Sequence, residues 1–145
     1  WMVGYPLSSS ERTEDPAGRL GWRPFELDQL HNLNVAASIQ LGKWRLGARI
    51  QAVSGNPYSP TRLVGGQLEQ VPWGGTLPAF FAFDVRADRR WHRCWGDINF
   101  YIDLQNATNH YNVEGRDPSG ETGMDADIQG LPLIPFIGVE FLPLK

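Results

Sequence analysis

The residues with the most potential for chemistry form one alternating run of charges. Asp84, Arg86, Asp88 and Arg90 occupy every second position, and such side chains share one face of a β-strand. Carboxylates that share a face are the groups that general acid–base catalysis uses. Alternating charges more often form a ladder of ion pairs with the neighbouring strand, and we favour that interpretation here.

Two carboxylates on the next predicted strand support the ladder. Asp97 and Asp103 are expected to point to the same side as the charged run, so that Arg86 and Arg90 both have acidic partners. The pattern therefore indicates a solvated polar wall and not a catalytic pair of carboxylates.

Other catalytic and metal-binding patterns are absent from the sequence. His31, His92 and His110 lack metal-ligand spacing, and residues 117–127 lack the Asp-x-Asp-x-Asp-Gly pattern of a calcium loop. The single Cys94 has no CxxC partner and is interpreted as a turn residue. There is no Gly-x-Ser-x-Gly elbow, phosphate-binding glycine loop or Cys–His pair. We therefore expect no enzyme, no metal and no cofactor.

Composition is that of a folded chain without a nucleic-acid partner. The 145 residues are 41% hydrophobic and 20% charged, as in folded proteins, and the net charge is -3. Binding to nucleic-acid phosphates needs clustered Lys and Arg, which the sequence lacks. The sequence contains no run of 18 apolar residues, so it predicts no transmembrane helix, and no signal peptide is visible. Because the chain starts at Trp1, we interpret it as a fragment of a longer protein.

The elements that hold the charged residues are predicted to be β-strands. Glycine and proline supply 16 and 11 residues, and no stretch keeps the apolar spacing of a helix. Apolar and polar residues alternate in the segments 33–41, 44–52, 81–91, 98–105 and 137–141. A further strand, truncated at its start, is expected at residues 1–9. The prediction is an all-β antiparallel sheet of about six strands.

The connections between these segments alternate in length. Long connections at residues 10–27, 55–78 and 107–133 are separated by short turns at Gly42-Lys43 and Arg93-Cys94. In an antiparallel meander, all the long loops then lie at one end, as in bacterial outer-membrane barrels. The strands, expected to have roughly 10 to 13 residues, also match the ~9–11 residues that a tilted membrane crossing needs.

Aromatic residues near the strand ends also favour a membrane barrel, although a soluble fold is an alternative. The residues in question are Trp44, Trp91, Trp95 and Tyr101. A soluble β-sandwich or calyx that binds a ligand has the same alternation, since one face packs a core and the other meets water. In the membrane interpretation, six strands cannot close by themselves, so the chain is an up-and-down transmembrane segment of a larger barrel.

Five segments, in order along the chain, resemble motifs of one family. They are Asp28-Gln29-Leu30-His31-Asn32-Leu33, Gly47-Ala48-Arg49 with Ser54-Gly55-Asn56-Pro57-Tyr58-Ser59-Pro60, Leu77-Pro78 with Asp84-Val85-Arg86-Ala87-Asp88-Arg89-Arg90-Trp91, Tyr101-Ile102-Asp103-Leu104-Gln105-Asn106-Ala107-Thr108-Asn109, and Leu131-Pro132-Leu133-Ile134-Pro135 with Gly138. Together they cover roughly residues 28–141 and resemble the C-terminal barrel strands of TonB-dependent outer-membrane receptors. By this resemblance, residues 1–145 are one C-terminal barrel segment without the plug domain.

The resemblance implies a barrel of about 22 strands, plugged by an N-terminal domain, which imports scarce nutrients such as ferric siderophores into a Gram-negative cell. The implied partners are outer-membrane lipid, the TonB energy-coupling complex through the missing N-terminal region, the outer-membrane barrel assembly machinery and a small-molecule chelate or nutrient. One departure is that members of the family usually end on an aromatic residue, whereas Leu142-Pro143-Leu144-Lys145 follows Phe141 here.

The expected function is an outer-membrane transport receptor, and a non-transporting outer-membrane protein is a further alternative. Candidate ligand-binding residues lie in the lumen, where cations attract an anionic chelate, or in the long loops. They are Arg45, Arg49, Tyr58, Trp73, Arg86 and Tyr111. The arginines can equally pair with neighbouring acids, and the aromatic residues can pack the loops against each other.

Overall fold

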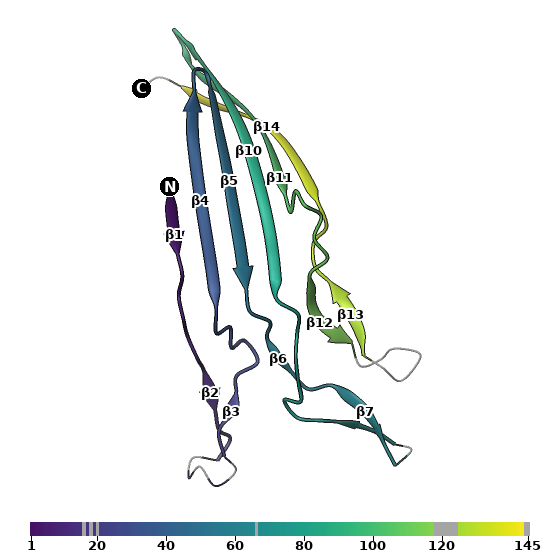
Figure 1. The fold of residues 1–145 in the computed structure, drawn as a ribbon. Coiled ribbons are helices and arrows are strands. Elements are labelled where there is room, and N and C mark those ends of the chain that lie inside the picture. Colours follow the sequence, from purple (N-terminus) through teal and green to yellow (C-terminus); the bar gives the residue numbers. More distant parts are fainter. Residues whose placement is uncertain (16, 18, 20, 66, 118–124, 144–145) are drawn as a thin grey trace.

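The chain folds into one six-stranded antiparallel sheet with small hairpins in its connections (Figure 1). This computed structural model describes residues 1–145 except 16, 18, 20, 66, 118–124 and 144–145, with backbone alone at 63 and 64. In their order across the sheet the strands are β1 (Met2–Gly4), β4 (Asn32–Leu41), β5 (Trp44–Val53), β10 (Phe80–Arg93), β11 (Gly96–Gln105) and β14 (Ile134–Pro143). The prediction of an all-β antiparallel chain is confirmed. No helix of the described residues is long and apolar enough to cross a membrane.

The register of the strands gives the sheet one apolar face and one polar face. Residues that lie directly opposite each other share a face. One row of such partners comprises Ile39, Leu46, Ala87, Ile102 and Ile137. The adjacent row, on the other face, comprises Ser38, Gly47, Arg86, Asp103 and Phe136. The alternation predicted from the sequence is therefore confirmed in the five long strands.

Two tight turns lie together at one end of the sheet (Figure 1). The β4–β5 turn is Gly42-Lys43, as predicted, and Gly42 has a φ of 59°, which suits glycine. The β10–β11 turn is Cys94-Trp95, one residue later than predicted, because Arg93 still pairs with Gly96. Cys94 is exposed in this turn.

The long connections all lie at the other end of the sheet and carry short hairpins, which the sequence did not predict (Figure 1). The pairs are β2 (Glu11–Arg12) with β3 (Arg23–Pro24), β6 (Pro57–Tyr58) with β9 (Gly75–Thr76), β7 (Thr61–Val64) with β8 (Gln67–Gln70), and β12 (Val113–Asp117) with β13 (Ala126–Gln129). Strands of two to five residues are too short for an alternating pattern to be visible. Residues 118–124 of the third connection lie outside the described residues, as do 144–145, the last two of the four residues that follow Phe141.

The first strand is shorter than the predicted 1–9. Only Met2–Gly4 pairs continuously with β4, and one isolated bridge then joins Leu7 to His31. Pro6 lies between them and has no backbone N–H to donate. The Tyr5 ring stacks on the His31 ring, and the Tyr5 hydroxyl lies 2.7 Å from His31 Nδ1.

The sheet has almost no interior. The buried hydrophobic residues of the described chain are Val53, Leu77 and Ala82. The accessible surface is 10362 Å², whereas a compact protein of this mass exposes about 7,500 Å². The excess includes the apolar face, on which Ile137 is 71% exposed and Val139 is 67% exposed. Contiguous exposed apolar residues are typical of a surface that contacts another molecule.

Two buried asparagines satisfy backbone groups at the loop end of the sheet. Asn106 directly follows β11 and has a φ of 47°. Its amide donates to the carbonyls of His110 (2.9 Å) and Leu131 (3.2 Å), and its Oδ1 accepts from the His110 N–H (2.9 Å). Asn112 accepts from the Phe81 N–H (2.9 Å) and donates to the Phe81 carbonyl (2.8 Å). These side chains replace a neighbouring strand where β11 has ended.

Candidate functional site

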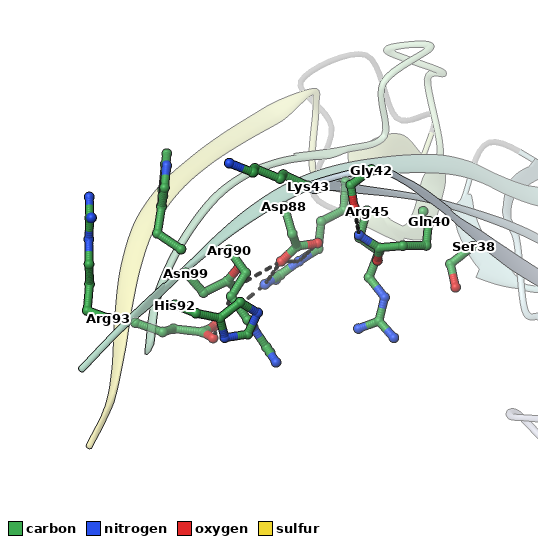
Figure 2. Close-up of a pocket in the computed structure, with 14 residues that line it drawn as sticks. Ser38, Gln40, Gly42, Lys43, Arg45, Asp88, Arg90, His92, Arg93 and Asn99 are labelled. Carbon is green, nitrogen blue, oxygen red and sulfur yellow. Dashed lines mark hydrogen bonds and ion pairs between the residues drawn. The ribbon is translucent and has the colours of Figure 1, made fainter. Parts of the chain in front are cut away.

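The polar face is concave and forms a basin of about 1070 Å³ at the short-turn end of the sheet. Figure 2 shows Ser38, Arg45 and Asp88 on the inner side of the arched strands. The cationic side chains of the polar face that line the basin are Arg45, Arg86 and Arg90, whereas Lys43 in the β4–β5 turn and Arg93, which belongs to the other face by register, border its rim. The acidic ones are Asp88 and Glu140. Positive charge is in excess, and a concave surface of that kind attracts anions.

Arg86 is the centre of an ion-pair network on this face. Its guanidinium lies 2.9 Å from Asp88 and 3.6 Å from both Asp103 and Glu140. The same group lies over the Tyr101 ring at 4.0 Å, which places this aromatic residue on the polar face. Three carboxylates share the charge of Arg86, so the predicted ladder is confirmed here. Arg86 is therefore better suited to hold the wall together than to bind a ligand.

Replacing Arg86 by methionine is expected to lower the free energy of unfolding by about 1–3 kcal/mol, because the clustered carboxylates lose their common donor. The matched control is Arg49→Met, which removes a single 2.7 Å ion pair with Asp84. The Arg49 side chain is 55% exposed and that of Arg86 is 37% exposed, so the control is expected to lose less than about 1 kcal/mol. Denaturant titration measures both losses of unfolding free energy. Equal losses would contradict the central role of Arg86.

The two other candidate arginines differ in their partners. Arg49 is committed to Asp84 and lines a smaller hollow of about 310 Å³ beside the basin. Arg45 lines the basin and lies opposite Asp88 in the register. No ion pair within 4.0 Å involves Arg45 in the described part of the chain, so its guanidinium is available to an external anion.

Arg90 has no acidic partner among the described residues, contrary to the prediction. The register puts Asn99 opposite Arg90 and puts Asp97 opposite His92. Asp97 lies 2.7 Å from His92, and the buried Asn99 amide donates to the Asp88 and Glu140 carboxylates (3.2 and 3.3 Å). A neutral amide thus occupies the place where an ion pair was expected, and Arg90 faces the basin uncompensated.

The loop aromatics lie at the opposite end of the sheet from the basin. Arg116 lies over the Tyr58 ring at 5.7 Å, and Arg23 lies over the Trp73 ring at 4.6 Å. Each contact joins two different long connections, which supports the interpretation that these aromatics pack the loops together. Tyr111 is 53% exposed. The six candidate residues therefore do not form one site.

The three histidines have separate local partners. His31 contacts Tyr5, His92 contacts Asp97, and the His110 ring meets the Phe81 ring edge-on at 5.6 Å. In the part of the chain that the structure describes, no three His, Cys, Asp or Glu side chains are grouped so that they could hold a metal ion.

The sequence interpretation did not include three residues of the basin and its network among the candidate site residues. Lys43 and Glu140 line the basin, and Asn99 links two carboxylates of the network. Alternation could have found Glu140, because it is an even position in a strand whose odd positions are apolar. Alternation places Asn99 on the polar face, but its link to two carboxylates depends on the two strands beside it.

The chain matches no protein-family model, and neither the curated proteins nor the solved structures include a significant match. The geometry of the sheet and the chemistry of its two faces are therefore what bear on function.

Proposed function

We propose that this chain forms part of the wall of an outer-membrane β-barrel receptor, and that the complete barrel imports a scarce nutrient such as a ferric siderophore. One observation carries the proposal: a single antiparallel sheet has an exposed apolar face and a concave, charged face. Transmembrane barrels turn the apolar face outward to lipid and the polar face inward to the lumen. A soluble sandwich or calyx would need the apolar face inside.

Strand lengths and loop positions support a membrane crossing. Four of the five long strands have 10 residues and β10 has 14, which is enough to cross a hydrocarbon layer of ~30 Å at a tilt. The tight turns lie at one end and the long connections at the other (Figure 1). In outer-membrane barrels these ends face the periplasm and the cell exterior, respectively.

The sheet needs further strands to close. β1 and β14 are its outermost strands, and each has a paired neighbour on one side only. An unpaired edge in hydrocarbon costs several kcal/mol for each backbone group, and single-chain barrels begin at about 8 strands. The resemblance to TonB-dependent receptors supplies the larger barrel, the plug and the energy-coupling partner as parts of the proposal.

The charge of the basin supports an anionic substrate. Arg45 and Arg90 lie on the polar face without an ion-pair partner in the described structure, and a ferric chelate with carboxylate or catecholate groups carries negative charge. Cations in a narrow lumen concentrate such ligands by long-range attraction. We therefore assign these two arginines to the path of the substrate through the barrel.

Cell fractionation tests the proposal. The complete gene product, expressed in a Gram-negative host, is expected in the outer-membrane fraction as a band whose mobility changes on heating, because a closed barrel resists detergent until it is heated. Iron-limited cells that carry it are expected to take up a ferric siderophore. Recovery of this chain as a folded protein without detergent would overturn the barrel; a membrane barrel that takes up no chelate would overturn the transport function only.

A further inference from the structure

One charged residue interrupts the apolar face of the sheet. The described strands place two arginines of β10 on this face. Arg89 lies within the strand, and Arg93 is its last residue. The row through it comprises Leu41, Trp44, Arg89, Phe100 and Val139. A cation in the middle of a lipid-facing surface is destabilising by about 2–4 kcal/mol, and by about 0–1 near its rim. The position of Arg89 along the strand therefore matters.

Arg89 lies at the rim, beside the tight turns. Its direct partner, Trp44, immediately follows the Gly42-Lys43 turn, and the Arg90 N–H donates to the Lys43 carbonyl at 3.4 Å. Trp95 in the second turn contacts the Phe141 ring, with 5.5 Å between the ring centroids. Tryptophans gathered at one end of membrane strands mark the level of the lipid headgroups.

The surroundings of the guanidinium lack a negative charge. Its central carbon lies 5.1 Å from the ring centroids of both Trp44 and Trp91. The Nε atom is buried and has no hydrogen-bond partner. No ion pair to Arg89 occurs among the described residues. Ring faces offset only part of the desolvation of a cation, so an anion that reaches this guanidinium is attracted by a charge that no carboxylate of the described residues neutralises.

We infer that Arg89, held between Trp44 and Trp91, binds the phosphate of a phospholipid headgroup in the leaflet at the short-turn end; this inference rests on the proposed membrane location. The N–H groups of the guanidinium lie in one plane as a fork that matches the oxygens of a phosphate. Hydrogen bonds between such charged groups are stronger than those between neutral groups. Lys43 in the β4–β5 turn and Arg93 at the end of β10 add positive charge at the same end of the sheet. The site therefore favours anionic headgroups over zwitterionic ones.

Lipid binding to the complete protein tests the inference. Protein purified from outer membranes is titrated with phosphatidylglycerol, and native mass spectrometry measures the bound fraction. Arg89→Met is expected to weaken binding about tenfold, because the phosphate loses its charge-assisted hydrogen bonds. Arg49→Met removes an arginine from the opposite face and is expected to leave the affinity unchanged. Phosphatidylcholine is expected to bind more weakly than phosphatidylglycerol to the wild type.

The outcomes separate this inference from the proposed function. Equal affinity of wild type and Arg89→Met, in a protein that is present in the membrane, overturns the lipid site alone. Competition by millimolar inorganic phosphate also overturns it, since the site would then bind a free anion. Absence of the wild type from outer membranes overturns the proposed function itself. If Arg89→Met fails to assemble, Arg89→Lys keeps the charge but loses the fork, and an undiminished affinity in that variant overturns the site.

Discussion

On the proposed outer-membrane location, replacing Ile39 by arginine is expected to reduce assembly of the complete protein, whereas arginine at the neighbouring Ser38 is expected to be tolerated. The two residues are adjacent in β4 and point to opposite faces of the sheet. Ile39 belongs to the apolar row that reaches Ile137 across five strands. Ser38 lines the basin, where an additional cation meets water.

The physical reason is the solvent that each face meets. Ile39 is 57% exposed, and an arginine at so exposed a position in water changes stability by only about 0.5 kcal/mol. In lipid, arginine destabilises a barrel by about 2–4 kcal/mol at the middle of the hydrocarbon and by about 0–1 kcal/mol near its rim, and Ile39 lies one row further from the rim than Arg89. The size of the effect thus reports whether the exposed apolar face lies against water or against lipid.

The measurement compares the heat-modifiable band of the two variants in outer-membrane fractions. The Ile39→Arg band is expected to be strongly reduced and the Ser38→Arg band to match the wild type. Assembly of both variants at wild-type levels would mean that the apolar face does not meet lipid. Loss of both would show that β4 accepts no added charge, and the two faces would then be equivalent.

Replacing Asn106 by alanine is expected to lower the free energy of unfolding by about 3–5 kcal/mol. Asn106 is only 5% exposed, and alanine leaves the carbonyls of His110 and Leu131 and the His110 N–H without their bonds. Buried groups that lose a partner cost about 1–3 kcal/mol each, with incomplete additivity. The φ of 47° adds to the loss, because alanine is disfavoured in the left-handed region by about 1–2 kcal/mol.

The control for this substitution is Thr108→Ala in the same turn. The Thr108 hydroxyl lies 3.5 Å from Asn106 Oδ1, at the limit of a hydrogen bond, so its removal is expected to cost less than about 1 kcal/mol. Denaturant unfolding measures both losses, and amide hydrogen exchange at His110 is expected to accelerate in Asn106→Ala alone. Similar stability of the two variants would contradict the role of Asn106 in closing the third connection.

Local patterns in the sequence were sufficient to predict the strands and the ends at which they are joined. Strands such as Asn32–Leu41 alternate with period two, and that period is a property of consecutive residues. The alternation of short and long connections needs only the order of the strands along the chain. The short hairpins of the long connections were missed, since strands of two to five residues show no measurable period.

The partners of individual side chains depended on the tertiary structure. The sequence put Arg90 and the carboxylates on one face, but only the register shows that Asn99 lies opposite Arg90 and Asp97 opposite His92. A shift of one residue exchanges the two faces, and a shift of two changes every partner while preserving the pattern. No local pattern contains that choice.

The apolar face combines both kinds of information. The sequence alone determined that one face of each long strand is apolar, because every second residue there is hydrophobic. Only the tertiary structure placed Arg89 of β10 beside Trp44 of β5, two residues that are far apart in the chain. The physical reason is that alternation is set by the backbone geometry of one strand, whereas contact across a sheet is set by hydrogen-bond pairing between strands.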